Sequence, residues 1–441
     1  MPLAASPAPP VPSHQLLVFL LQVSLLLGLA VLLGRGAARI GMPALVGELL
    51  VGLLLGPSLL GHIAPELSGW LLPRSADQMH MLDAFGQIGV LLLVGITGSR
   101  LDLGMVRRRG RTAAQISVTG LAVPLALGIG TGYLVPAALL PAHADRTVFA
   151  LFLGVAMCVS AIPVIAKTLT DMNLLHRNIG QLTLAAGIVD DIAGWLMLSI
   201  VSALAVSHLD GGRLGLSLLY LVAVVAFAAL PGRPLVRWVM SRAASAGPGG
   251  TAAVATVLML GGAAATQAMG LEAIFGAFVA GIVIGACGAV GPVALAPLRT
   301  VVLGVLAPVF FATAGLRVDL TALARPQVLA TGTAVLAVAV LGKFAGAYLG
   351  ARLGRLSRWE ALALGAGMNA RGVIEVVVAT AGLSLGVLSG EMFTVVVLVA
   401  VVTSLMAPPI LRLAMGRVEH TAEERLREID LLGPGTGERV G

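Results

Sequence analysis

Cysteine, lysine and charged residues in general are scarce in this 441-residue chain. Its two cysteines, Cys158 and Cys287, both lie in apolar stretches, and we interpret them as small packing residues. No Cys-x-x-Cys pair or histidine cluster occurs, which argues against a zinc or iron site. A Gly-x-x-x-x-Gly-Lys-Ser/Thr loop is also missing, so ATP drive is not encoded here. We expect no cofactor, and an enzyme is the least favoured class.

What the chain has instead is apolar surface. Hydrophobic residues make up 58% of it and charged residues only 11%, with a mean hydropathy of +0.99. That composition is typical of a polytopic membrane protein whose partner is the lipid bilayer. The 56 glycines fit closely packed helices, because small side chains let helix backbones approach. The formal net charge of +7 could suggest nucleic acid, but the placement of the basic residues indicates membrane topology instead.

The apolar runs predict an all-α fold with about thirteen transmembrane segments. They cover roughly residues 15–33, 40–60, 82–99, 112–136, 147–170, 178–206, 214–231, 251–269, 271–288, 299–316, 327–351, 359–384 and 390–414. Residues 1–14 are expected to form a flexible lead, 15–414 the transmembrane domain, and 415–441 a short polar tail. The first run has no preceding basic residue and no convincing cleavage site, so we predict a retained helix.

The basic residues fix the predicted orientation. Most of the 28 lysines and arginines fall in alternate loops on one side or after the last segment. The opposite side holds only Arg74, Arg146, Arg213, Arg317 and Arg325. The positive-inside rule therefore predicts an outer N-terminus and a cytoplasmic C-terminus, and we expect the plasma membrane as the location.

An internal repeat is visible in two motifs. Glu48-x-x-x-Gly52 and Glu272-x-x-x-Gly276 each open a short glycine-rich helix. Gly98-Ser-Arg100-Leu-Asp102-Leu and Gly315-Leu-Arg317-Val-Asp319-Leu each end the helix that follows, and they are the stronger half of the signal. An odd number of predicted helices separates the copies, so the second copy is inverted in the membrane. Inverted repeats are typical of alternating-access transporters, with the substrate near the midplane.

Two adjacent carboxylates, Asp190 and Asp191, lie near the middle of a predicted membrane segment, in Gly187-Ile-Val-Asp-Asp-Ile-Ala-Gly-Trp195. One ionisable group at that depth costs about 2.5–3.5 kcal/mol on insertion scales. Two neighbours cost more, because each like charge disfavours ionisation of the other. The alternative is a pair kept neutral or salt-bridged for packing. We favour a working ion site.

Two predicted helices are broken inside their apolar runs. In one of them, Ser160 and Pro163 belong to Cys158-Val-Ser-Ala-Ile-Pro-Val, and the proline removes a backbone donor. The second break is Gly365-Ala-Gly-Met-Asn369-Ala-Arg371-Gly. A freed carbonyl at membrane depth is tolerated only where it is buried or lines a cavity. One break alone is equally well an ordinary kink, but a pair, one in each half of the chain, points to a transport site.

Five more charged residues lie within or at the ends of predicted membrane segments. Lys343 needs a partner or must lose its proton, and the aspartate pair is the obvious candidate, with snorkelling to an interface as the alternative. Arg371 and Glu375 lie one helical turn apart, so we expect a supporting ion pair there. Glu48 and Glu272 open short helices, where capping or packing between the repeats is the expected role. Carboxylate, hydroxyl and carbonyl oxygens are hard donors that suit alkali cations.

Taken together, these residues resemble the monovalent cation:proton antiporter-2 superfamily over about 16–414. Ser160-Ala-Ile-Pro-Val-Ile-Ala-Lys167 and the Asp190–Asp191 helix look like its fourth and fifth core helices. Gly342-Lys343 and Asn369-Ala-Arg-Gly-Val-Ile-Glu375 look like its later charged helix and second broken helix. Within the superfamily the likeness is nearest to plant cation/proton exchangers and related potassium/proton antiporters.

The resemblance implies a homodimer in which a core domain moves against a scaffold. It also implies that Asp191 is the essential carboxylate, with Asp190 bound to Lys343 when no cation is present. Plant-like relatives usually carry Asn-Asp at these positions, whereas an Asp-Asp pair is similar to electrogenic sodium/proton antiporters. The cation, Na⁺ or K⁺, therefore stays open. Only about 27 polar residues follow Ala414, so no fused nucleotide-binding domain is expected.

The prediction is a secondary antiporter that exchanges Na⁺ or K⁺ for protons, with Asp190 and Asp191 as the alkali-cation ligands and Ser160 adding oxygen. Two rivals are a sodium-coupled symporter of an organic anion and a non-transporting ion sensor. Lys343 beside the acids argues against the symporter, and the intact acid pair argues weakly against the sensor.

Overall fold

The computed structural model describes residues 11–40, 42–72, 76–101, 103–174, 176–207, 211–245, 247–288, 294–422 and 424, and within these ranges every regular element is helical. The predicted all-α class is therefore confirmed. Asp102, most of the predicted N-terminal lead and most of the polar tail lie outside the described residues.

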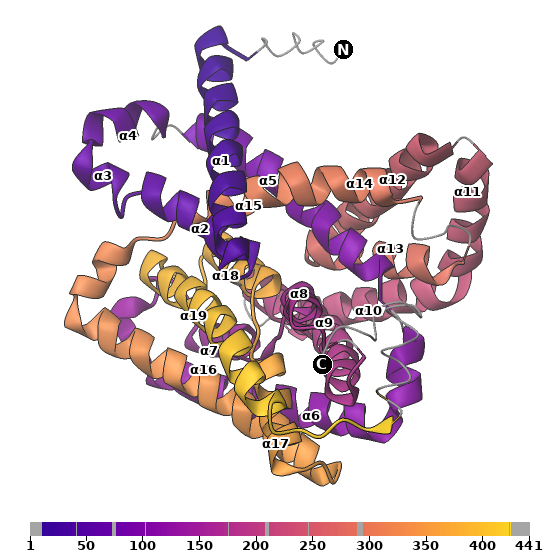
Figure 1. Cartoon of the computed structure of the whole chain (residues 1–441). Coiled ribbons are helices and arrows are strands. Elements are labelled where there is room, and N and C mark those ends of the chain that lie inside the picture. Colours follow the sequence, from indigo (N-terminus) through magenta and orange to yellow (C-terminus); the bar gives the residue numbers. More distant parts are fainter. Residues whose placement is uncertain are drawn as a thin grey trace.

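The helices form two groups that pack mainly within themselves (Figure 1). The first, which we call the scaffold, contains α1 (Ser13–Arg39), α2 (Ala44–Leu55), α5 (Ala76–Ser99), α12 (Gly247–Ala268), α13 (Ala273–Ala286), α14 (Ala296–Val301) and α15 (Ala307–Gly315). The short helices α3 (Leu60–Ile63) and α4 (Pro65–Leu71) follow α2.

The second group, which we call the core, contains α6 (Leu103–Leu134), α7 (Arg146–Cys158), α8 (Ile162–Asp171), α9 (Asn178–Ser207), α16 (Pro326–Leu353), α17 (Arg358–Met368), α18 (Val373–Ser384) and α19 (Gly390–Met415). Between the groups run α10 (Gly211–Phe227) and α11 (Arg233–Ser245), joined by a π-helical turn. Direct contacts between core and scaffold include α9 with α13 and α15 with α18.

The predicted count of thirteen spans is not confirmed. Ten helices of the described residues are long and apolar enough to cross a membrane, or eleven if the bent pair α17–α18 is one span. The other two predicted segments contain shorter apolar helices, Arg146–Cys158 and Ala273–Ala286. The first stops early because the chain breaks at Val159, and the second is limited to 14 residues between the N-cap Glu272 and the C-cap Cys287.

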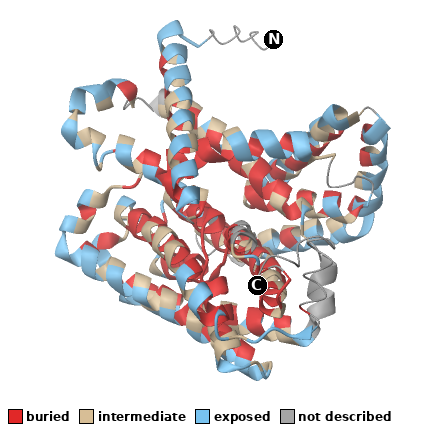
Figure 2. Cartoon of the chain, in the orientation of Figure 1, coloured by how far each residue is buried: buried red, intermediate tan, exposed pale blue. Residues whose placement is uncertain are grey.

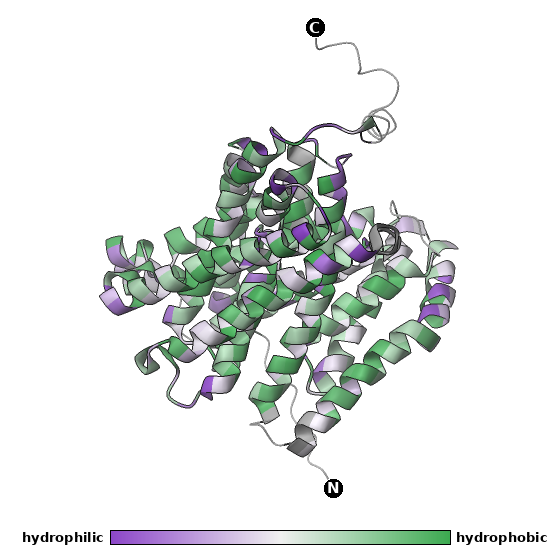
Figure 3. Ribbon diagram, turned by 90° about the horizontal axis from the view of Figure 1, so that it is seen from below, coloured by the Kyte–Doolittle hydropathy of each residue, from purple (hydrophilic) through white to green (hydrophobic). Residues whose placement is uncertain are grey.

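Buried residues are concentrated where the helices meet, whereas α1, α11 and α16 turn exposed faces outward (Figure 2). The outward faces of α1 and α16 are apolar. Leu32 on α1 and Leu341 on α16, for example, are 64% and 67% exposed. Hydrophobic residues dominate the helices in Figure 3, and the most hydrophilic residues lie mainly near helix ends. Large outward apolar surface on long helices indicates an integral membrane protein.

Glycine contacts within the scaffold support the repeat. Gly47 and Gly52 of α2 lie directly against the backbones of α1 and α15, so closely that a Cβ would clash. Gly276 and Gly281 of α13 lie in the same way against α12 and α5. In each copy the first glycine, Gly47 or Gly276, packs the short helix against the helix before it, α1 or α12. The second glycine, Gly52 or Gly281, packs it against the last helix of the other copy, α15 or α5.

These contacts change the predicted register of the repeat. They align Gly47 with Gly276, so Glu48 corresponds to Ala277, five positions after Glu272. Matching the two Glu-x-x-x-Gly motifs was therefore wrong in register, because the glycine at a helix contact is the constrained position and the neighbouring acid is not. The two glutamates need separate explanations.

The chain that follows α19 folds back onto the start of α9. Arg177, which is 3% exposed, donates to the carbonyls of Val418 and Glu419 at 2.9 and 3.1 Å and pairs with Glu424 at 3.2 Å. Glu424 belongs to the predicted polar tail, yet only 2% of its side chain is exposed. Burial acts to raise the pKa of Glu424, but the backbone N–H groups of Asn178 and Thr421 and the charge of Arg177 outweigh it and lower that pKa.

Candidate cation-binding site

Two interrupted helices meet at the centre of the core. The helical chain stops at Cys158 and resumes at Ile162, and it stops again at Met368 and resumes at Val373. The two interruptions are joined directly, because the Ala161 N–H donates to the Ala370 carbonyl at 3.1 Å. The predicted pair of broken helices is thus present, and α17 and α18 differ in direction by 45°.

The C-terminal end of α7 is closed by side chains from other helices. Arg371 donates to the carbonyls of Ala156 and Met157 at 3.0 and 2.7 Å, and Lys343 donates to that of Cys158 at 2.5 Å. The last carbonyls of a helix have no partner within it and carry partial negative charge. The buried side chains of Arg371 and Lys343 therefore satisfy the last carbonyls of α7, which water would satisfy at an exposed helix end.

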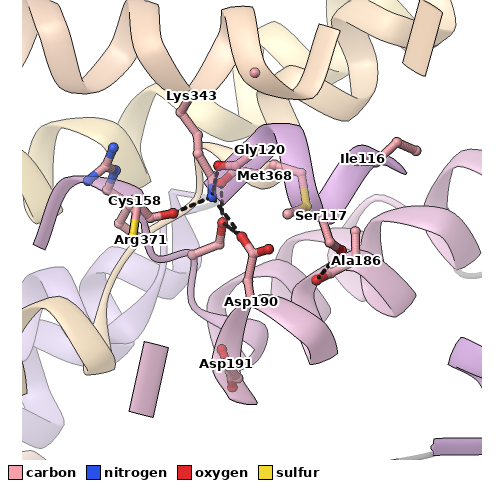
Figure 4. A network of polar contacts seen from close by, with 12 residues as sticks. Ile116, Ser117, Gly120, Cys158, Ala186, Asp190, Asp191, Lys343, Met368 and Arg371 are labelled. Atoms are coloured by element: carbon pink, nitrogen blue, oxygen red, sulfur yellow. Dashed lines mark hydrogen bonds and ion pairs between the residues drawn. The ribbon is translucent and has the colours of Figure 1, made fainter. Parts of the chain in front are cut away.

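Lys343 and Asp190 form a fully buried ion pair, with Nζ 2.7 Å from Oδ2 and neither side chain exposed (Figure 4). Lys343 also donates to the Gly120 carbonyl at 3.0 Å. The Ser160 hydroxyl lies 2.9 Å from the same Asp190 oxygen and 2.7 Å from the Met368 carbonyl. Snorkelling of Lys343 to an interface is thereby ruled out, since its ammonium group is held by three helices of the core.

Asp191 is the less compensated carboxylate. It is 1% exposed and lies further along α9, away from Lys343 (Figure 4). Within the described residues, its one hydrogen bond comes from the Ile162 N–H at the start of α8, at a long 3.4 Å. A buried charge without a close cationic partner is unfavourable. Asp191 is therefore the group of this pair that most needs a proton or a cation.

The remaining predicted residues surround this centre. The expected Arg371–Glu375 pair is present at 3.3 Å, with both side chains buried. Asn369 is fully buried, and its amide has no hydrogen-bond partner among the described residues. Pro163 occupies the second position of α8, but its side chain lies outside the described part of the chain.

Sequence reasoning missed four contributors. The Gly120 and Met368 carbonyls hold Lys343 and Ser160, but backbone groups carry no sequence signal. Ser404 of α19 donates to the Arg371 carbonyl and fixes the second break from outside. Trp195, one turn after Asp191, is 2% exposed and packs on Phe278 of α13 with ring centroids 5.9 Å apart. Trp195 is the last residue of the motif that contains the two aspartates, and that position was the only sequence signal for its role.

Comparisons with known proteins agree with the resemblance drawn from the sequence. The family model for the transmembrane sodium/hydrogen exchanger matches residues 24–415. The chain belongs to the sodium/hydrogen exchanger family. It is 31% identical over 404 residues to the Na⁺/H⁺ antiporter NhaS4 of Synechocystis, covering 90% of this chain and 97% of that one. It is 26% identical to the Na⁺/H⁺–K⁺ antiporter GerN of Bacillus cereus, with 90% and 96% covered.

Plant and yeast relatives are similar over part of their length. The yeast K⁺/H⁺ antiporter 1 is 29% identical over 416 residues, which cover 91% of this chain and 47% of that one. The chain thus spans about half the length of such relatives. Among solved structures, the sodium/proton antiporter MjNhaP1 of Methanocaldococcus jannaschii matches with a TM-score of 0.60 at 15% identity, covering 95% of this chain. The protein is a cation:proton antiporter, and the symporter and sensor alternatives lose their support.

Proposed function

We propose that this antiporter exchanges Na⁺ or K⁺ for protons at the Asp190–Asp191 pair, and that Asp191 is the carboxylate that binds the cation or a proton. The observation that carries the proposal is the asymmetry of the pair. Asp190 is neutralised by Lys343 at 2.7 Å, whereas among the described residues Asp191 has only a long hydrogen bond from the Ile162 N–H. One site that a proton and a cation must share gives obligatory exchange without a catalytic reaction.

The cycle follows from charge balance in a buried site. Without a cation, a proton neutralises Asp191 and Lys343 neutralises Asp190. When a cation arrives, Asp191 releases its proton and binds the ion through carboxylate oxygen, an alkali-cation ligand. The Ser160 hydroxyl and the backbone oxygens at the two breaks would add further ligands, and the 2.7 Å contact of Ser160 with the Met368 carbonyl supports this.

Lys343 decides the stoichiometry of this scheme. If the Lys343–Asp190 pair stays intact, one proton leaves for each cation and the exchange is electroneutral. If the cation also draws Asp190 away, the uncompensated Lys343 must lose its own proton, and two protons then move against one cation. That second route is electrogenic, and each net charge is worth about 2.3 kcal/mol per 100 mV of membrane potential.

Alternating access would be provided by movement of the core against the scaffold. The core holds both breaks, and the Ala161–Ala370 hydrogen bond ties them together. A homodimer joined through scaffold helices, in the plasma membrane with an outer N-terminus and a cytoplasmic C-terminus, completes the proposal. The exposed apolar faces of the helices supply the contact with lipid.

The test is solid-supported-membrane electrophysiology on reconstituted protein, with Na⁺ and K⁺ concentration jumps at several pH values. Asp191→Asn should abolish exchange, whereas Glu66→Gln, at an exposed acid of α4, should leave it unchanged. A transient current for one cation identifies that ion and an electrogenic cycle. Cation-driven proton movement seen with a pH dye but without current indicates electroneutral exchange. Full activity of Asp191→Asn would overturn the site.

A further inference from the structure

A cavity separate from the aspartate pair lies between scaffold and core. Its volume is about 390 Å³, and its lining comes from α5, α9, α12, α13, α15 and α18 and from the α12–α13 connection. A smaller cavity of about 110 Å³ adjoins it, because Gln87, Phe310, Thr380 and Ser384 line both. Both lie where α9 and α18 end and α5 begins, on the predicted outer side.

The lining of the larger cavity is suited to a cation. Glu272 is the carboxylate in it, and Gln87, Gln267, Thr380 and Ser384 contribute amide or hydroxyl oxygens. Ser202, only 3% exposed, lies near the Glu272 carboxyl without reaching hydrogen-bond geometry, so its Oγ has no hydrogen-bond partner among the described residues. Such oxygen donors match the preference of alkali cations, and the volume leaves room for water around the ion.

Helix geometry connects this cavity to the aspartate pair. Ser202 follows Asp191 by eleven residues on α9, which is about 16 Å along the axis and about 20° from the same face. Trp195 lies between them on that face, packed on Phe278 of α13. One face of one helix thus carries the cavity lining, an aromatic contact between core and scaffold, and the exchange carboxylate, in that order.

We propose that Glu272, together with Ser202 and Gln87, forms a loading site for a hydrated alkali cation on the cavity side of the membrane, and that the Trp195–Phe278 contact separates this site from Asp191. The proposal rests on the exchange function of Asp191. A carboxylate inside a cavity with low-dielectric walls raises the local cation concentration. Glu272 keeps partial solvent contact, so it can hold its charge at a smaller cost than the fully buried acids.

The experiment measures cation-driven proton movement in right-side-out and inside-out membrane vesicles, so that the cation is supplied to one face at a time. Glu272→Gln should raise the half-saturating Na⁺ or K⁺ concentration about tenfold from the cavity side, the low end of what electrostatic focusing provides. The maximal rate and the half-saturation from the opposite face should stay within about twofold. Glu66→Gln removes a charge on the same predicted side outside the cavity and should change neither value.

Two further variants separate charge from local structure. Glu272→Asp keeps the carboxylate and should stay within about twofold of the wild type. Gln87→Leu keeps Glu272 but removes a polar wall of both cavities, so it should weaken cavity-side half-saturation about threefold. Unchanged half-saturation in Glu272→Gln, or equal changes from both faces, would overturn the loading site. Either result leaves the exchange function standing, whereas a wild-type protein that moves no protons would remove that function itself.

Discussion

Replacing Lys343 with methionine is the most informative perturbation of the core. Methionine keeps an unbranched apolar chain of similar length but removes all three donated hydrogen bonds. Asp190 is then left as a buried carboxylate that, among the described residues, retains the Ser160 hydroxyl as its one hydrogen-bond donor. Removing one partner of a buried ion pair costs about 3–5 kcal/mol, because the other charge stays uncompensated. We expect Lys343→Met to lower the free energy of unfolding by about that amount.

A double-mutant cycle shows whether the loss comes from the orphaned charge. Asp190→Asn in the Lys343→Met background removes that charge, so the double variant should be more stable than Lys343→Met alone. Interaction energies of contacting residues are usually about 0.5–3 kcal/mol, and a buried ion pair should lie at the upper end. The assay is denaturant unfolding in mixed micelles, followed by tryptophan fluorescence.

The control is Leu341→Met on the same helix, whose side chain is 67% exposed. A surface substitution of this kind should change the free energy of unfolding by no more than about 0.5 kcal/mol. Two results would refute the reasoning. One is a Lys343→Met protein within about 1 kcal/mol of wild type, and the other is strict additivity of the two substitutions, which would mean that the pair has no energetic coupling.

Two further predictions concern the scaffold and the tail. Gly52→Ala places a Cβ against the α15 backbone and should lower the free energy of unfolding by about 1–3 kcal/mol. Gly28→Ala, with open space around it, should be neutral or stabilising in the same assay. Equal effects of the two variants would contradict the close glycine contact. The pKa of Glu424 is lowered, so tail docking through Arg177 is intact above the usual glutamate pKa of about 4.3 and weakens as pH falls through the folded value. Limited proteolysis between about pH 5 and 3 should show this loss of docking in the wild type and in the exposed-acid control Glu419→Gln. Glu424→Gln should remove the pH dependence. A Glu424→Gln protein with the same pH profile as the wild type would refute the role of Glu424 in tail docking.

Sequence reasoning singled out the charged residues of the candidate site because charged side chains are rare within membrane segments. Asp190, Asp191, Lys343, Arg371 and Glu375 stand out in apolar runs, and an isolated charge at that depth must find a partner. Both predicted ion pairs, Lys343–Asp190 and Arg371–Glu375, are present. The all-α class followed in the same way from long apolar runs.

The rest was hidden for physical reasons. Backbone acceptors such as the Gly120 and Met368 carbonyls exist at every residue, so their roles depend on which helices cross. The predicted register of the repeat was wrong because it was set by the two glutamates, which are rare in apolar runs. The glycines that fix the register are common in this chain and therefore give little sequence signal. The count of thirteen spans is not confirmed, because hydropathy measures apolar length and does not report where a helix stops within it.

The three donors of Lys343 have a consequence for coupling. A protonated lysine has three N–H groups, and here each is used by a different helix: α6 through Gly120, α7 through Cys158 and α9 through Asp190. If the ammonium group gives up a proton, at least one of these three attachments must open. Proton release at Lys343 and loosening of the helices around it would then be a single event. Loss of a proton at this position would therefore also allow the core helices to move relative to one another.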